Sequence, residues 1–147
     1  MKKELALYVS WVLACLSVLG SLYFSVIRNL DPCDLCWYQR IALFPLVPIL
    51  GIAAYRTFFE IIPFVLPQIF FGLLVALYQV GIQEIPNWHP IALCGSGPSC
   101  VEKIHIGLGF VTIPMLSAGV FFLMGTLLTY AMLQENEPKK LAYVYVK

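Results

Sequence analysis

The chain has 147 residues, of which 61% are hydrophobic and 12% are charged, and its mean hydropathy is +0.86. These values exclude an ordinary soluble protein and predict a single membrane domain, with room for about four spans and no separate soluble domain. The formal net charge is +1, and the nine Lys and Arg residues are scattered rather than grouped in a basic stripe, so nucleic acid is not an expected partner.

Four apolar runs predict the spans. They cover residues 5–27, 37–55, 61–82 and 106–133, and about 20 residues at ~1.5 Å per residue cross a hydrocarbon layer of ~30 Å. Short connections imply antiparallel neighbours, so we expect an all-α, antiparallel four-helix transmembrane bundle, followed by a cytoplasmic tail over 134–147. Prolines that predict kinks rather than ends of spans are Pro45, Pro48, Pro63, Pro67 and Pro114.

The cations near the span ends predict how the bundle lies in the membrane. Cations on one side are Lys2, Lys3, Arg56, Lys139, Lys140 and Lys147, and those on the other are Arg28, Arg40 and Lys103. Because cytoplasmic segments carry an excess of Lys and Arg, we expect both termini in the cytoplasm. The connections after the first and third spans are then both extracytoplasmic, where disulfides form and persist.

The first of these connections carries Cys33 and Cys36, with the two-residue spacing of redox-active dithiols. The start of the second span directs amide donors and a partial positive charge at a thiolate, and Cys36 is the better placed of the two. Arg40 follows one helical turn later, so we expect its guanidinium under Cys36, where it stabilises an anionic sulfur or a reduced quinone oxygen. The alternative for Arg40 is a snorkelling interfacial cation. Asp34 opposes a thiolate by like charge and receives no catalytic role.

The connection between the third and fourth spans, about residues 83–105, carries Cys94 and Cys100 among Gly, Pro and Ser residues. Five intervening residues close a disulfide loop without a tight backbone, and a mobile turn region lets one sulfur reach an external partner and then another pair. Taken alone, this pair fits a thiol shuttle or a static disulfide staple equally well. The first pair favours the shuttle. A dithiol beside the lipid phase can pass electrons to a lipid-soluble acceptor such as a quinone, and it then needs a source of electrons.

Two other classes of protein fit part of the pattern. The four loop cysteines are also the ligand set of a structural zinc site, since Cys-x-x-Cys is half of such a site. A non-catalytic four-span scaffold with two stapled loops is the second alternative. It predicts that replacement of Cys36 or Arg40 leaves the oxidation of exported proteins unchanged. Cys15, deep in the first span, is expected to be inert packing.

The segment Cys33-Asp34-Leu35-Cys36-Trp37-Tyr38-Gln39-Arg40 resembles the Cys-x-x-Cys-x-x-x-Arg signature of the DsbB family of bacterial thiol:disulfide interchange membrane proteins. The four-span plan and the second cysteine pair also resemble this family, and the likeness covers essentially residues 1–133. The compact spacing of Cys94 and Cys100 is more similar to the short Gram-positive members, called BdbC.

The resemblance implies a quinone-dependent oxidase of the bacterial cell membrane that re-oxidises an extracytoplasmic thioredoxin-like thiol oxidase. Cys94 is then the cysteine that the reduced partner attacks, and Cys100 is its resolving mate. Cys33 and Cys36 form the pair next to the quinone, with Cys36 as the sulfur that contacts it. Arg40 is the electrostatic support of this contact, and no metal is expected.

The resemblance leaves two candidates for a further neighbour of the quinone. They are Gln79, near the end of the third span, and His89, in the second cysteine loop. The quinone itself is ubiquinone or menaquinone, and the short second loop leaves the order of exchange between the two loops open.

Overall fold

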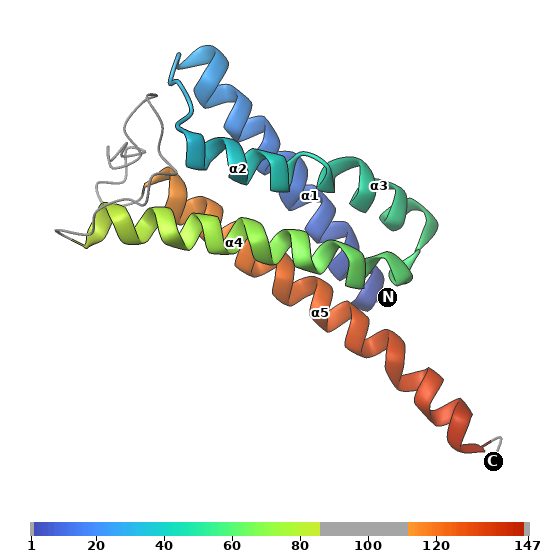
Figure 1. Ribbon diagram of the computed structural model, residues 1–147. Helices are drawn as coiled ribbons and strands as arrows, with labels where there is room; N and C mark the ends of the chain where they lie inside the picture. The colour runs from blue at the N-terminus through green and yellow to red at the C-terminus, as the bar shows by residue number, and fades with distance from the viewer. Residues whose placement is uncertain (1, 86–111, 146–147) are drawn as a thin grey trace.

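The computed structural model describes residues 2–85 and 112–145 (Figure 1). Within this part of the chain, the helical segments long and apolar enough to cross a membrane are Lys3–Ile27, Asp34–Arg56, Phe59–Glu84 and Ile113–Gln134. The predicted all-α bundle of four spans is therefore confirmed.

The first, third and fourth spans are long helices. The first is α1 (Lys2–Leu22), which widens at its end into the π-helix η1 (Tyr23–Ile27). The third is α4 (Ile62–Glu84), which follows the 3-10 turn η2 (Phe59–Ile61). The fourth is α5 (Ile113–Tyr145), which continues past the predicted end of the span. The predicted start of this last span, at residue 106, lies outside the described residues.

The second span, expected as one helix over 37–55, consists of two helices, α2 (Asp34–Leu43) and α3 (Leu46–Arg56). They meet at Phe44 and Pro45, because a proline has no backbone N–H and interrupts regular helical hydrogen bonding. The kink expected at Pro45 is therefore a break between two helices. The two halves of this span pack against different neighbours: α2 packs mainly against α4, whereas α3 packs against α1.

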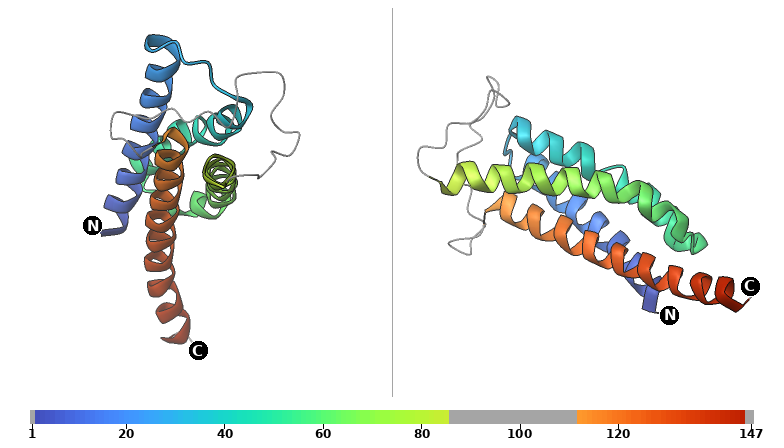
Figure 2. Two further views of the ribbon diagram at one scale, coloured as in Figure 1. Left: turned by 90° about the vertical axis from the view of Figure 1, so that its left-hand side faces the viewer. Right: turned by 60° about the horizontal axis from the view of Figure 1, so that its bottom comes forward.

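The helices alternate in direction along the bundle. α5 packs against both α1 and α4 (Figures 1 and 2). The N-terminus and the last turns of α5 lie at one end of the bundle, whereas the connection from α1 to α2 and the end of α4 lie at the other (Figure 1). The start of α2 is thus at the same end of the bundle as the last residue of α4 and the first of α5.

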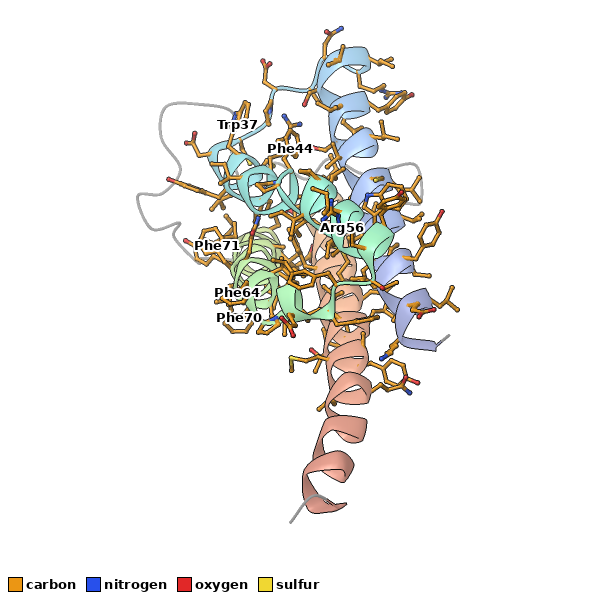
Figure 3. All side chains as sticks on the ribbon, turned by 90° about the vertical axis from the view of Figure 1, so that its right-hand side faces the viewer. Trp37, Phe44, Arg56, Phe64, Phe70 and Phe71 are labelled. Carbon is orange, nitrogen blue, oxygen red and sulfur yellow. The ribbon has the colours of Figure 1, made fainter. Side chains whose placement is uncertain are left out.

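Small residues bring the spans close together at two points of the core. A Cβ atom on Gly72 of α4 would lie 2.4 Å from the ring of Phe121, and one on Gly51 of α3 would lie 2.8 Å from Nε1 of Trp11. Glycine therefore permits the close helix contacts that pack spans in lipid. Other positions of α4 carry exposed aromatic side chains that point outward (Figure 3), namely Phe64, Phe70 and Phe71.

Candidate functional site

The first cysteine pair lies at the start of α2. Cys33 is the N-cap residue and Cys36 is in the first turn, because the helix begins at Asp34, three residues before the predicted start of the span. Both cysteines are free thiols, and their Sγ atoms are hydrogen-bonded at 3.0 Å. The first turn of a helix carries unpaired N–H groups and the positive end of the helix dipole. The predicted juxtaposition of the dithiol with a helix N-terminus is therefore present.

The two cysteines differ in their surroundings. Cys33 is 6% exposed and packs in a small cluster with Leu35 and Ile82, whereas Cys36 is half-buried and lines a cavity. The hydrogen bond with Cys36, together with burial, raises the pKa of the Cys33 thiol above its usual range. Cys33 therefore keeps its proton, and Cys36 is the sulfur of the pair that a ligand in the cavity can reach.

Two buried glutamines form a network beside the dithiol at the interface of α2 and α4, and one of them, Gln79, contacts both sulfurs. Gln79 donates from Nε2 to Sγ of Cys33 at 3.3 Å and to Sγ of Cys36 at 3.6 Å. Its Oε1 accepts a hydrogen bond from Nε2 of Gln39 at 2.7 Å and a longer one from the Cys36 thiol at 3.9 Å. Gln79 is 2% exposed and Gln39 is 7% exposed. Water therefore has little access to this network, and its hydrogen bonds depend on the protein groups alone.

Gln79, one of the two candidates for a neighbour of the quinone, has its amide against the two sulfurs; its contact with a quinone stays a prediction. Gln39 was missed as a site residue. The signal that pointed to it is a carboxamide three residues after Cys36, in a helix whose polar side chains need buried partners. Its partner is 40 positions away, and nothing in the local sequence indicates that pairing.

Arg40 reaches from α2 to α1. Its Nε donates to Oγ of Ser21 at 2.8 Å, its Nη2 donates to the Ser21 carbonyl at 3.0 Å, and Nη2 also donates to Oγ of Ser25. The guanidinium lies 5.3 Å from the ring centre of Trp37, within cation–π range. The expected position was directly under Cys36. The hydrogen bonds of Arg40 go to Ser21 of α1 and Ser25 of η1, and Arg40 and Cys36 line the same cavity.

This cavity has a volume of about 350 Å³ and opens between α1, α2 and α5. Its walls are mainly aliphatic and aromatic. The polar residues in its lining are Ser17, Ser21, Ser25, Asp31, Cys36, Gln39, Arg40 and Ser117. The volume is at the lower end of the range of small-molecule pockets, and apolar walls with a few polar groups suit a hydrophobic ligand with a polar head group.

The second cysteine pair, Cys94 and Cys100, and the candidate His89 lie outside the described residues, so the zinc alternative and the exchange between loops stay predictions. Over residues 2–85 and 112–145, no three His, Cys, Asp or Glu side chains are grouped as metal ligands would be. Cys15 is a half-buried free thiol of α1, away from the dithiol.

Comparisons with known proteins connect this site to disulfide chemistry. The model of the family described as Disulfide bond formation protein DsbB matches residues 3–131. A Probable disulfide formation protein of Chlamydia trachomatis is 46% identical over 129 residues, covering 88% of this chain and 93% of the relative. A protein of the same description from Coxiella burnetii is 44% identical over 130 residues, 88% of each chain. Disulfide bond formation protein C of Bacillus subtilis is 43% identical over 118 residues, covering 80% of this chain and 86% of the relative. No solved structure matches the chain significantly.

Proposed function

Because this chain belongs to the DsbB family of disulfide bond formation proteins, we propose that it is a quinone-dependent oxidase of an extracytoplasmic thioredoxin-like protein. The family and the four spans make it a multi-pass membrane oxidoreductase that acts in disulfide formation. The proposal adds the electron acceptor, the class of partner and the residues that connect them.

One observation carries the proposal: Cys36 and Arg40 line the same mainly apolar cavity of a membrane span. The lining fits a quinone, because apolar walls suit the ring and its tail, and guanidinium N–H groups suit a carbonyl oxygen. A bound quinone, ubiquinone or menaquinone, supplies an acceptor for two electrons and two protons. The positive guanidinium of Arg40 stabilises negative charge on a sulfur or on a ligand oxygen nearby.

The thiol steps are exchanges on contact. A thiolate of the partner attacks Cys94 in a Cys94–Cys100 disulfide, which forms a mixed disulfide and releases Cys100 as a thiolate. The second thiolate of the partner then attacks its own sulfur in the mixed disulfide, which releases Cys94 and leaves the partner as a disulfide. The resulting Cys94/Cys100 dithiol reduces a Cys33–Cys36 disulfide in the same way. Each step breaks one S–S bond, forms another and moves two electrons. Cys33 retains its proton while Cys36 faces the cavity, so the electrons leave through Cys36. The acceptor sets the direction, since for two electrons every ~30 mV of potential difference is worth ~1.4 kcal/mol.

We call this transfer of electrons from the partner through Cys94/Cys100 to Cys33/Cys36 the relay. It needs both cysteine loops on the outer face of the bacterial cell membrane, with both termini in the cytoplasm. The start of α2 and the end of α4 lie at the same end of the bundle, which supports this proposal (Figure 1). Single-cysteine reporters in a cysteine-free chain test it: we expect a membrane-impermeant maleimide to label Arg28→Cys in intact cells and Thr57→Cys only after lysis. The reverse pattern contradicts the orientation.

Anaerobic mixing tests the relay. Purified protein, quinone and a reduced thioredoxin-like dithiol are combined, and quinone reduction is followed in the wild type and in Cys36→Ser, Cys94→Ser and Cys15→Ser. We expect loss in the first two variants and the wild-type rate in Cys15→Ser. A small dithiol such as dithiothreitol should restore quinone reduction to Cys94→Ser but not to Cys36→Ser, because it reduces the inner pair directly.

Two further measurements distinguish the proposed oxidase from a structural zinc protein and from a scaffold. A structural zinc site predicts one zinc per chain by metal analysis and no oxidisable pairs. A scaffold predicts wild-type oxidation of exported proteins in cells that carry Cys36→Ser. Either result would overturn the proposed function.

A further inference from the structure

We propose that Gln79, oriented by Gln39, sets the reduction potential of the Cys33–Cys36 pair by stabilising its reduced form. The inference rests on the redox role of this pair in the proposed function, but it does not depend on which acceptor takes the electrons.

The orientation of the Gln79 amide is fixed by its partner. A carboxamide accepts through its oxygen and donates through its NH₂ group. Oε1 of Gln79 is occupied by Nε2 of Gln39 at 2.7 Å, so Nε2 of Gln79 faces the two sulfurs at 3.3 and 3.6 Å. A flipped amide would bring the NH₂ groups of Gln79 and Gln39 together and leave the Gln39 donor without its acceptor. Gln39 therefore acts through Gln79, as a positioning residue.

The donated hydrogen bonds favour the reduced pair. Oxidation removes two electrons and two protons from the two thiols and forms the S–S bond, and reduction reverses each of these changes. A thiol or thiolate sulfur accepts a hydrogen bond better than a disulfide sulfur, which carries little negative charge, so the amide loses its acceptors on oxidation. Because Gln79 is 2% exposed, water does not replace them. The network therefore makes the pair a stronger oxidant.

A raised potential has a consequence for the relay. It favours transfer of electrons into Cys33 and Cys36 from another dithiol, and it reduces the driving force for their transfer onward. A structural role, in which the two glutamines only join α2 to α4, predicts no effect on this balance.

The potential is measured without quinone, in a Cys94→Ser/Cys100→Ser background where Cys33 and Cys36 are the only oxidisable pair. Detergent-solubilised protein is equilibrated with glutathione or dithiothreitol redox buffers, and the reduced fraction is read by alkylation and mass spectrometry. In Gln79→Met, which keeps an unbranched side chain without a donor, we expect about a tenfold shift of the exchange equilibrium toward the disulfide, ~30 mV more negative.

Gln39→Met should shift the equilibrium in the same direction but only about threefold, and adding it to Gln79→Met should change nothing further, because it acts through Gln79. The matched control is Gln68→Met on the same helix, whose Nε2 donates to the Ala42 carbonyl at 2.8 Å; we expect the wild-type potential. If Gln79→Met does not fold, Gln39→Met carries the test by itself. If the folded glutamine variants have the wild-type potential or a more oxidising one, the inference is overturned. If their potentials shift as expected but the wild type does not reduce quinone, only the proposed acceptor is overturned.

Discussion

The two sides of the dithiol are built differently. Toward α4 lies a closed network of two buried carboxamides, in which Gln79 donates to both sulfurs and accepts from Gln39, the member that also borders the cavity. Toward α1 and α5 lies a cavity of about 350 Å³, in which Cys36 is the reactive group and Arg40 the cation. The closed side excludes water and can set how strongly the pair oxidises. The open side admits a ligand and can set how fast the pair transfers electrons.

The largest effect should come from filling the open side. Gly20 lines the cavity, and a Cβ atom there meets nothing within 4 Å, so Gly20→Leu places its side chain in open space. A displaced ligand loses its reactive alignment, and we expect the rate of quinone reduction to fall by about 100-fold. The potential of the dithiol should stay at the wild-type value, as measured in glutathione buffers.

The control for this substitution is Gly119→Leu. A Cβ atom on Gly119 also meets nothing within 4 Å, and this residue is outside the lining of the cavity. We expect close to the wild-type rate. Equal losses of rate in both leucine variants would mean that a leucine disturbs the packing of the spans in general, and that the loss does not come from filling the cavity.

Removal of the cation on the open side should have the next largest effect. In Arg40→Met we expect the catalytic efficiency with quinone to fall about 30-fold, since a charge-assisted hydrogen bond contributes ~2 kcal/mol. Arg40→Lys keeps a positive charge but not the planar fork that bonds to Ser21 and Ser25, so it should recover only part of the activity. Steady-state kinetics with varied quinone checks both values, and wild-type efficiency in Arg40→Met contradicts a role in the cavity.

Phe121 links the core to the open side, because its ring packs on Gly72 and also lines the cavity. In Gly72→Ala the new methyl group would lie 2.4 Å from that ring. Overpacking of this kind should lower the folded-to-unfolded ratio about tenfold, ~1.4 kcal/mol, in unfolding measured in detergent. Gly20→Ala, with nothing within 4 Å of its Cβ, is the matched control. Failure of Phe121→Leu to restore stability to Gly72→Ala would show that the ring is not the cause.

The smallest effect should come from the serines that orient Arg40. Ser21→Ala and Ser25→Ala each remove one hydroxyl acceptor, and we expect about a threefold loss of catalytic efficiency with quinone in each. Ser10→Ala, in α1 like Ser21, removes a hydroxyl that donates to the Ala6 carbonyl. It should leave the kinetics unchanged. If all three alanine variants behave alike, the orientation of Arg40 by α1 has no kinetic role.

Much of the fold was predictable because the information is local. A run of about 20 apolar residues identifies a span wherever it packs, since lipid leaves the backbone no partner other than its own helix. The Cys-x-x-Cys spacing likewise predicts the dithiol at the start of α2, because a spacing of two residues brings two sulfurs of one short segment close together.

The tertiary structure decided which neighbour each side chain meets. Pro45 by itself predicts an interruption of the second span, but only the tertiary structure shows that α2 packs on α4 whereas α3 packs on α1. Arg40 was recognised as a cation of the site, yet its hydrogen bonds go to Ser21 and Ser25, which lie 15 to 19 positions earlier. Gln39 and Gln79 meet across 40 positions. Hydrophobicity determines that a helix enters the membrane. The shapes of the neighbouring helices determine which faces of that helix become buried, and the local sequence pattern does not contain the shapes of those neighbours.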